Sequence, residues 1–347
     1  DNDNFAAVYN LTQKLIERGN KTIAFIGAKS DINVSKDRLN GYKQAMYSRN
    51  IEIDNELIIE MNNFTEEEGY IASHRILEKN NKWGYMFYIS YRGEKFHSFD
   101  EVSGKVSVKS EFKRVMNELG FTWAKGIQQA GRTDAKVSAE ENILYVSSNY
   151  LGEFKEIVQK FNDQMKEKMF IKKVAKTLPN LSFPEFVEKR EYIYSLPKKK
   201  IVTEKEKIAE LCEEFSGTYD VSRFTDKKGL ELKEHIRTVE INFENGKLRF
   251  LGDSFMPKQV RITSGYILTG KMEALPGKYL SLEKIYLKKE LEDSLLEIRP
   301  ELQEEDVERI ESSKDGKLFI FYVTKEKKGQ VIGKNGKNIK FLRKKYG

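Results

Sequence analysis

One carboxylate stands in a short run of small and polar residues, Ala130-Gly131-Arg132-Thr133-Asp134-Ala135. A carboxylate such as that of Asp134 can act as a nucleophile or stabilise a cationic carbon, and neither task requires a metal or an organic cofactor. Taken alone, the run also fits an ordinary turn in which the aspartate accepts hydrogen bonds from nearby backbone N–H groups. The residues that follow it along the chain bear on which interpretation holds.

Four further motifs follow this run in order. They are Arg190-Glu191-Tyr192-Ile193-Tyr194, the stretch from Gly217 to Phe224, Arg237-Thr238-Val239, and Phe255 through Val260-Arg261 to Gly265. Together with the first run they resemble the bacterial tRNA pseudouridine synthase A (TruA) family, in which the aspartate of a G-R-T-D-A stretch is catalytic. The resemblance implies that Asp134 is the catalytic residue.

The resemblance also implies a chemistry. Conversion of uridine to pseudouridine breaks a C–N glycosidic bond and joins the same ribose carbon to C5 of the detached uracil. Burial of an unpaired carboxylate raises its pKa, so the acid needs a positioned cation to stay ionised under the substrate. By resemblance, Arg261 is the arginine that pairs with Asp134, and Tyr192 is the tyrosine that stacks on the target base and assists proton removal from C5. A base inside a helix cannot be reached, so we expect the nucleotide to be flipped out.

The chain departs from the usual family pattern G-R-T-D-A-G-V-H-A at two positions, with Lys136 in place of the glycine and Ser138 in place of the histidine. Lys136 adds bulk and charge two residues from the acid, which would either block a close backbone approach or supply a new phosphate contact. Because the three expected catalytic residues are retained, we favour an active enzyme, and a catalytically silent RNA-binding protein is the alternative. The expected substrate-binding residues are Arg132, Lys136 and Arg237.

Several patterned segments must position these residues. Tyr85–Tyr91 is aromatic and β-branched and predicts a strand. Val108–Leu119 predicts an amphipathic helix whose apolar residues recur at helical spacing. The run that contains Asp134 precedes a predicted strand at Ile143–Val146, so it falls in a loop, where a rigid scaffold can present a polar side chain to a cleft.

The first 80 residues form a separate block. Helices are predicted at Phe5–Arg18, Lys36–Arg49 and Thr65–Leu77, and strands at Thr22–Ile26 and Glu56–Ile59, which indicates a parallel α/β arrangement. Two stretches, Leu15–Gly27 and Arg38-Leu39-Asn40-Gly41-Tyr42, resemble in sequence the effector-binding core of LacI/GalR-type repressors. In that family the arginine matching Arg38 contacts a sugar or purine. Only part of such a core is represented, so we expect a vestigial or fused fragment, and a working sensor is the alternative.

The last residues carry most of the basic surplus, since residues 314–347 hold 11 Lys and Arg against 2 Asp and Glu. A helix is predicted at Glu301–Ser312 and a strand at Lys317–Thr324. The stretch from Val331 to Lys340 resembles the G-x-x-G loop of a KH domain, which clamps the backbone of single-stranded nucleic acid. A solvated basic tail is the alternative. The expected RNA-binding residues are Gly333, Lys334, Asn335, Gly336 and Lys337.

Composition sets the outer limits. The chain has 347 residues, of which 39% are hydrophobic and 33% charged, and it contains no apolar run of bilayer-spanning length. No signal peptide is apparent, so we expect a cytoplasmic protein. Cys212 is the single cysteine, which excludes an intrachain disulfide, and the three histidines are not spaced as metal ligands.

These observations predict an α+β chain in three parts. Residues 1–80 are expected to form a partial parallel α/β block like that of periplasmic binding proteins, and residues 291–347 a small KH-like segment. Residues 81–290 are expected to form a pseudouridine-synthase-like body of two α/β halves, whose antiparallel sheets join around a central cleft. By family resemblance the substrate is structured RNA, most simply the anticodon stem-loop of tRNA, the assembly is a homodimer, no cofactor is used, and no membrane is involved. A fragment of a sugar-responsive transcriptional regulator is the remaining alternative.

Overall fold

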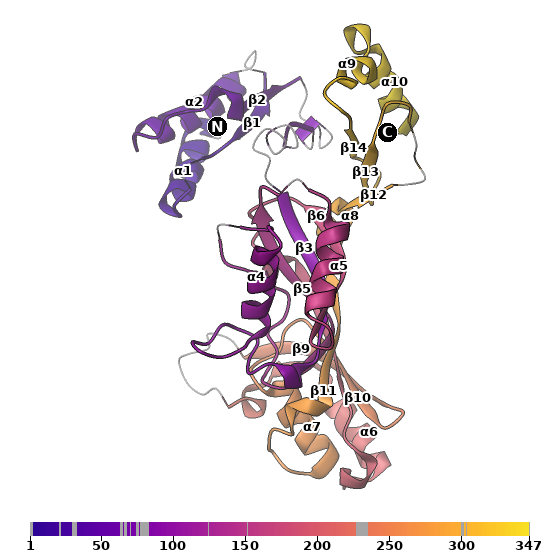
Figure 1. Ribbon diagram of the computed structural model, residues 1–347. Coiled ribbons are helices and arrows are strands. Elements are labelled where there is room, and N and C mark those ends of the chain that lie inside the picture. Colours follow the sequence, from indigo (N-terminus) through magenta and orange to yellow (C-terminus); the bar gives the residue numbers. More distant parts are fainter. Residues whose placement is uncertain are drawn as a thin grey trace. The chain divides into compact units, whose positions relative to one another are not determined.

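The structure is a computed structural model that describes residues 3–20, 22–29, 33–62, 65, 68–69, 71–73, 76, 83–123, 125–150, 152–226, 235–299, 302 and 304–346. The chain divides into two compact units, Trp83–Glu297 and Asp1–Lys82 together with Ile298–Gly347 (Figure 1). We call Trp83–Glu297 the body, residues 1–82 the amino-terminal block and residues 298–347 the carboxy-terminal segment, and describe each by itself.

A mixed sheet forms the frame of the body, with the strand order β6-β3-β5-β11-β7-β10-β9-β8. Most neighbouring strands are antiparallel. The first half contributes β3 (Trp83–Tyr91), β5 (Ser138–Ser148) and β6 (Met169–Thr177). The second half contributes β7 (Val187–Tyr194), β8 (Gly217–Asp220), β9 (Ile236–Glu244), β10 (Lys247–Gly252) and β11 (Leu280–Leu287). A short strand, β4 (Gln128–Gln129), pairs with β5.

The two halves join where β5 and β11 pair in parallel, through Ser138 with Ser281 and Ala139 with Leu282. These pairs lie at the beginning of both strands. The loops that precede the two strands therefore meet at the same edge of the sheet, and one of them carries Asp134.

Helices α4 (Val108–Glu118) and α5 (Phe154–Gln164) cover the first half of the sheet (Figure 1). Phe87 of β3 meets Phe112 of α4 with ring centroids 5.1 Å apart and Phe121 at 5.3 Å, and all three side chains are fully buried. Ser107 caps α4 in a capping box with Ser110, which fixes where the helix begins. The helix predicted at Val108–Leu119 is confirmed as α4. The strand predicted at Ile143–Val146 is the centre of the longer β5.

In the second half, α6 (Lys205–Glu214) and α7 (Gln259–Thr269) provide the helical layer. Phe215, directly after α6, packs edge-on against Phe224 at 5.1 Å and against Tyr266 of α7 at 5.8 Å. Cys212 of α6 is buried, and burial raises the pKa of its thiol to about 11, as expected of a small hydrophobe. The body ends with α8 (Lys289–Ser294) and the first two residues of β12 (Leu296–Ile298), of which Leu296 pairs with Lys176 of β6.

The amino-terminal block contains α1 (Asn4–Glu17), β1 (Phe25–Ala28), α2 (Asn33–Tyr47) and β2 (Ile58–Met61). β1 and β2 pair in parallel, as the alternation of helices and strands predicts. Each strand begins and ends two or three residues later than predicted. Tyr42 packs with Ile23 and Met46 and donates its hydroxyl proton to the carbonyl of Ile23 at 2.8 Å. Much of the helix predicted at 65–77 lies outside the described residues.

The carboxy-terminal segment contains the hairpin of β13 (Arg309–Ser313) and β14 (Phe319–Tyr322), followed by α9 (Lys328–Ile332) and α10 (Lys337–Tyr346). The predicted strand at 317–324 is therefore confirmed. The helix predicted at Glu301–Ser312 is wrong, because Arg309–Ser313 is a strand. Pairing with β14 overrides the preference of this glutamate-rich stretch for a helix.

Candidate active site

A cavity of about 540 Å³ opens in the body beside the junction of β5 and β11. Its walls come from residues 129–134 and 137, from the β7 residues 190 and 192, and from residues 254–261 at the beginning of α7, with 184 and 280 completing them. Among the described residues that line it, Asp134 is the one acid, and the bases are Arg132, Arg190, Lys258 and Arg261. The cavity therefore suits a ligand that carries negative charge.

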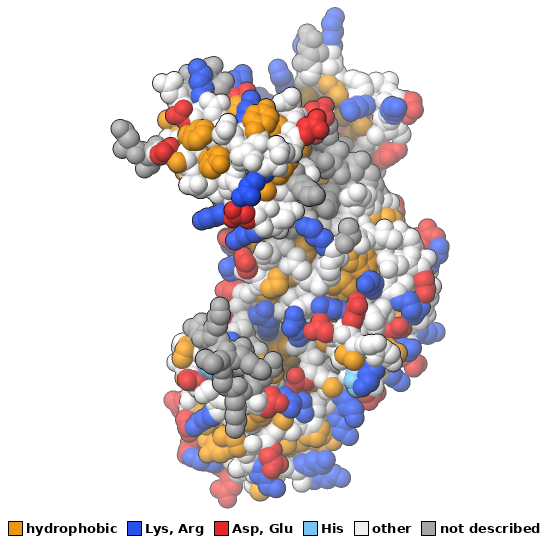
Figure 2. Space-filling view, turned by 90° about the vertical axis from the view of Figure 1, so that its left-hand side faces the viewer, with side chains coloured by type: hydrophobic (Ala, Val, Ile, Leu, Met, Phe, Trp, Pro, Cys, Tyr) orange, Lys and Arg blue, Asp and Glu red, His pale blue; other side chains and the backbone are white. Residues whose placement is uncertain are grey.

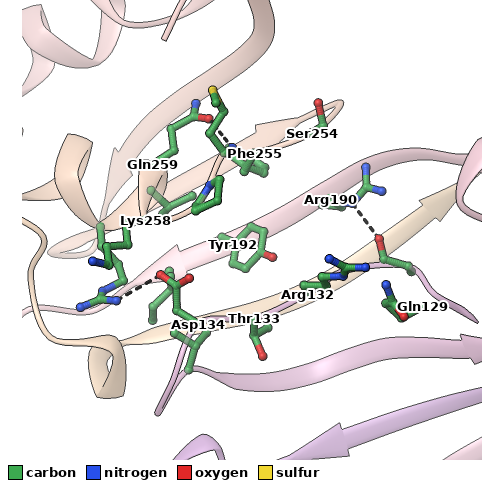
Figure 3. A pocket seen from close by; sticks show the side chains of 18 of the residues that line it. Gln129, Arg132, Thr133, Asp134, Arg190, Tyr192, Ser254, Phe255, Lys258 and Gln259 are labelled. Atoms are coloured by element: carbon green, nitrogen blue, oxygen red, sulfur yellow. Dashed lines mark hydrogen bonds and ion pairs between the residues drawn. The ribbon is translucent and has the colours of Figure 1, made fainter. Parts of the chain in front are cut away.

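Asp134 and Arg261 form an ion pair in the wall of this cavity (Figure 3). The Arg261 Nη1 donates to the Asp134 Oδ2 at 3.1 Å, and the two side chains are 16% and 29% exposed. The Arg261 Nε donates to the carbonyl of Leu275 at 2.6 Å, so the guanidinium is fixed on two sides. A ligand can cover Asp134 without leaving its carboxylate unpaired.

The chain closes a tight turn immediately after Asp134. The N–H of Val137 donates to the carbonyl of Asp134 at 3.1 Å, and Lys136 within this turn has a φ of +66°. Such a backbone conformation favours glycine. This explains in physical terms why the family pattern has glycine at the position of Lys136, and it means that the lysine is held in a strained conformation.

Two glycines hold this turn in place. A Cβ on Gly93 would lie 2.2 Å from the carbonyl oxygen of Val137, and one on Gly277 would lie 2.5 Å from that of Ala135. Any side chain at either glycine would displace the turn. Ser138, the second departure from the family pattern, accepts a hydrogen bond from the N–H of Gly93 at 3.0 Å, so its side chain also helps to fix the turn.

Asn142 of β5 orients the residues before Asp134 and was not singled out from the sequence. It is fully buried, its Nδ2 donates to the carbonyl of Gly131 at 2.8 Å, and its Oδ1 accepts from the N–H of Gly131 at 3.2 Å. Its Nδ2 also lies 3.3 Å from the hydroxyl of Tyr91, which shares a hydrogen bond with Thr133 at 2.9 Å. An asparagine directly before the apolar run Ile143–Val146 was the one available signal for this role.

Tyr192 of β7 lies among the labelled side chains of the cavity in Figure 3, with Asp134 to one side of it and Arg190 to the other. The side chain is 6% exposed and its ring meets that of Phe255 edge-on, with centroids 5.3 Å apart. Burial raises the pKa of its phenol well above the usual value, and the nearby Tyr91 and Asp134 act in the same direction. The phenol is therefore protonated at neutral pH and offers a ring and an O–H donor.

The two other arginines of the cavity serve different purposes. The Arg190 Nε donates to the carbonyl of Ala130 at 2.8 Å and its Nη1 donates to the carbonyl of Asp253, so this side chain ties the two walls together. Arg190 begins the motif Arg190-Glu191-Tyr192-Ile193-Tyr194, but the sequence alone did not predict this structural role. The Arg132 side chain is 71% exposed, with its Nε 3.3 Å from an Asp100 carboxylate oxygen, and can meet a ligand at the mouth of the cavity.

The expected substrate-binding set is only partly brought together. Arg132 lines the cavity, whereas Lys136 and Arg237 do not. Lys136 is exposed on the turn after Asp134. Arg237 is half-buried on β9, where its Nη1 donates to the carbonyl of Ile236 at 2.6 Å.

The other expected binding residues lie outside the body. Gly333 and Gly336 both have positive φ, +71° and +72°, in the turn between α9 and α10, and α10 begins at Lys337. Lys334 is exposed in this turn, and the side chain of Asn335 lies outside the description. Arg38 of α2 lines a separate cavity of about 460 Å³ in the amino-terminal block, where its Nε donates to the Asn4 Oδ1 at 3.0 Å.

Among the described residues, no group of three or more His, Cys, Asp or Glu side chains is placed to hold a metal ion. In the same part of the chain, no helix has the length and apolar character that crossing a membrane requires.

The arrangement of the cavity is suited to one kind of chemistry. Among the described residues that line it, the cavity provides one carboxylate neutralised by a fixed guanidinium, a protonated phenol in the wall, and an exposed arginine at the mouth. A carboxylate in this setting can attack an electrophilic sugar carbon or stabilise positive charge on it.

Comparison with known proteins gives two similarities. The chain is 42% identical over 78 residues to the HTH-type transcriptional regulator MalR of Streptococcus pneumoniae, which is 22% of this chain and 24% of the regulator. It is 28% identical over 214 residues to tRNA pseudouridine synthase A of Picrophilus torridus, which is 60% of this chain and 78% of the synthase. The corresponding protein of Oenococcus oeni is 28% identical over 211 residues and covered to 81%. Both family resemblances are confirmed.

The chain thus spans about a quarter of the length of the regulators that it matches and more than three quarters of these two synthases. No protein-family model matches it. Among solved structures, it is similar to the transcription regulator CcpA of Lactococcus lactis, with 38% identity, a TM-score of 0.21, and coverage of 22% of this chain and 28% of that one. It is also similar to a Cbf5-Nop10-Gar1 complex, with 15% identity, a TM-score of 0.27, and coverage of 57% and 47%. The KH-like character of the carboxy-terminal segment stays a prediction.

Proposed function

We propose that the chain is an RNA pseudouridine synthase that uses Asp134 as its catalytic carboxylate. The observation that carries the proposal is the Asp134–Arg261 ion pair beside Tyr192 in the wall of one cavity, in a chain similar to tRNA pseudouridine synthase A over 60% of its length. Residues 130–134, 192 and 261 come from three separate motifs, and the fold brings them to one place.

In the proposed reaction, Asp134 attacks C1′ of the uridine or stabilises positive charge there while the C1′–N1 bond breaks. The detached uracil anion turns within the cavity, and C5 bonds to C1′ as C1′ is released from Asp134. The hydrogen on C5 leaves as a proton, and N1 takes up a proton. Arg261 holds the carboxylate, and the ring of Tyr192 supports the base. Because the Tyr192 phenol is protonated, it accepts the C5 proton only after passing its own proton on, and N1 of the detached uracil is an acceptor for that proton.

The RNA is proposed to be tRNA, with a uridine of the anticodon stem-loop as the target. The bases at the cavity suit a polyanion, and Arg132 is exposed to contact a phosphate at the mouth. The carboxy-terminal segment, with its G-x-x-G turn and basic surplus, is proposed as a second RNA contact. We further propose that the protein is a homodimer and acts in the cytoplasm. Light scattering of the purified chain tests the oligomeric state.

Tritium release from tRNA labelled at C5 of uridine tests the enzyme. We expect release by the unaltered chain and a loss of at least about 10³-fold in Asp134→Asn, because the amide cannot replace the carboxylate. Asp163→Asn, an exposed change on α5, is the matched control and should leave release unchanged. Full turnover by Asp134→Asn would remove Asp134 from the mechanism. Absence of release by the unaltered chain, with RNA binding intact, would favour the silent RNA-binding protein.

A second candidate function concerns the amino-terminal block alone. The 42% identity to MalR and the position of Arg38 on the wall of a separate cavity favour binding of a sugar or purine there. Calorimetry of the full chain with a panel of sugars and purines tests this, with Arg38→Ala as the variant that abolishes the heat. No heat with any member of the panel would leave the block without a ligand-binding role.

A further inference from the structure

Two lysines flank one tyrosine next to the catalytic turn, and a third lies on the turn itself. The Nζ atoms of Lys278 and Lys200 lie 5.2 Å and 5.6 Å from the centre of the Tyr279 ring. Gly277, next to Lys278, packs against the carbonyl of Ala135, which is next to Lys136. We call Lys136, Lys200, Lys278 and Tyr279 the Tyr279 surface.

The charges of this surface are uncompensated. All three lysines are exposed, and within the described part of the chain none of them forms an ion pair with a carboxylate. By contrast, Arg132 within the catalytic loop and Lys109 of α4 both pair with Asp100. Figure 2 shows Lys and Arg side chains interspersed with Asp and Glu over the visible face, so total charge does not single out a binding surface, whereas the position of these lysines around Tyr279 and the turn after Asp134 does.

The surface is rigidly joined to the active site. The hydroxyl of Tyr194 in β7 donates to the carbonyl of Pro276 at 3.0 Å, and the N–H of Ser195 donates to the carbonyl of Tyr279 at 2.8 Å. On the other side, Gly277 leaves no space between its segment and the turn after Asp134. A ligand group bound by these lysines is therefore held at a fixed position relative to the catalytic carboxylate.

We propose that the Tyr279 surface binds the phosphodiester backbone of the substrate RNA beside the nucleotide that enters the cavity. Lysine ammonium groups are compact cations that bind phosphate oxygens, and the Tyr279 ring restrains two of them. The strain at Lys136 fits this role, because the strained backbone presents an additional ammonium group next to the acid. This inference rests on the proposed function, since it takes an RNA strand in the cavity as given.

The test is the salt dependence of binding of the full chain to a fluorescently labelled, unmodified tRNA transcript. The variant is the double change Lys200→Gln and Lys278→Gln. The control is Lys155→Gln with Lys289→Gln, which removes two exposed lysines from α5 and α8, at the far ends of β3 and β11 from the turn. We expect the slope of log K against log salt to fall by about 0.7 for each phosphate that the variant no longer neutralises, so by about 1.4, and the affinity to fall about tenfold at low salt. The control should move neither quantity.

An equal change of slope in the two double variants would overturn the inference, and so would failure of the unaltered chain to bind the transcript. The proposed function is tested separately by tritium release. Tritium release without a specific change of slope would support the proposed synthase activity and rule out the Tyr279 surface as an RNA contact. A specific change of slope without tritium release would support the RNA contact and rule out the synthase activity. Adding Lys136→Gln to the variant should lower the slope by a further, similar amount.

Discussion

The body and the amino-terminal block differ in how completely each covers its own apolar surface. In the body, Phe87 and Phe121 are fully buried between the sheet of many strands and the helices α4 and α5. In the block, β1 and β2 form a sheet of two strands, the hydrophobic side chains packed on the core cluster of Ile23, Tyr42 and Met46 are only partly buried, and Leu11 of α1 is 59% exposed. The comparison teaches that a recognisable sequence pattern does not by itself supply a complete core. We therefore expect the chemistry of the chain to depend on the body.

Core substitutions should give the largest difference between the two regions. Phe87→Ala should lower the free energy of unfolding of the body by about 3–5 kcal/mol, because it empties the centre of the aromatic cluster. Leu11→Ala should cost the block less than about 0.5 kcal/mol, because the side chain is already largely in water. Both tryptophans, Trp83 and Trp123, belong to the body, so tryptophan fluorescence during urea unfolding reports on the body and circular dichroism on both regions. Equal losses would contradict the comparison.

Alkaline pH should destabilise the body by a smaller amount. Burial raises the pKa of Tyr91 in the body to about 12, whereas a tyrosine in an unfolded chain titrates near 10. The unfolded state therefore releases this proton first, and the associated stability is complete below about pH 10 and is lost as the pH rises to 12, an effect of about 2–3 kcal/mol. Urea unfolding followed by tryptophan fluorescence should show a weaker pH dependence in Tyr91→Phe. Tyr47→Phe, at an exposed position of α2, is the control and should leave the pH dependence unchanged.

A matched pair of glycine substitutions should give the smallest effects, with opposite signs. Lys136→Gly should stabilise the body by about 1 kcal/mol, because it relieves a left-handed backbone at a φ of +66°. Lys14→Gly should destabilise the block by about 1 kcal/mol, because Lys14 lies inside α1. Thermal unfolding of both variants measures the direction in which each melting temperature shifts. A lower melting temperature for Lys136→Gly would show that contacts of the lysine outweigh its backbone strain.

The candidate site was predictable from the sequence where its residues lie within motifs. Asp134, Tyr192 and Arg261 came from ordered motifs, and all three line one cavity. Asn142 lies outside these motifs and acts on Gly131, 11 residues before it. Gly277 could not be found in this way, because it acts through a contact with the backbone of Ala135, which is remote in sequence. The contact of Gly277 depends on the register of β5 and β11, which no local pattern encodes.

The fold was predictable where local periodicity and burial agree. α4 lies within one residue of its prediction because its apolar residues follow helical spacing and Ser107 caps its beginning. The stretch 301–312 failed because its glutamates favour a helix, whereas Arg309–Ser313 gains more by pairing with β14. The partner strand decided that outcome, and its contribution is not visible in a local window of sequence.

The parallel contact of β5 with β11 also determines when the site can exist during folding. Asp134 and Arg261 are separated by 127 residues in the chain, and the pairing of Ser138 with Ser281 spans a longer interval still. Contacts of such long range carry a high loop-closure cost and form late, after each half has made its own local structure. Catalytic competence should therefore return after tryptophan fluorescence during refolding, so that activity marks the docking of the two halves and not the formation of either one.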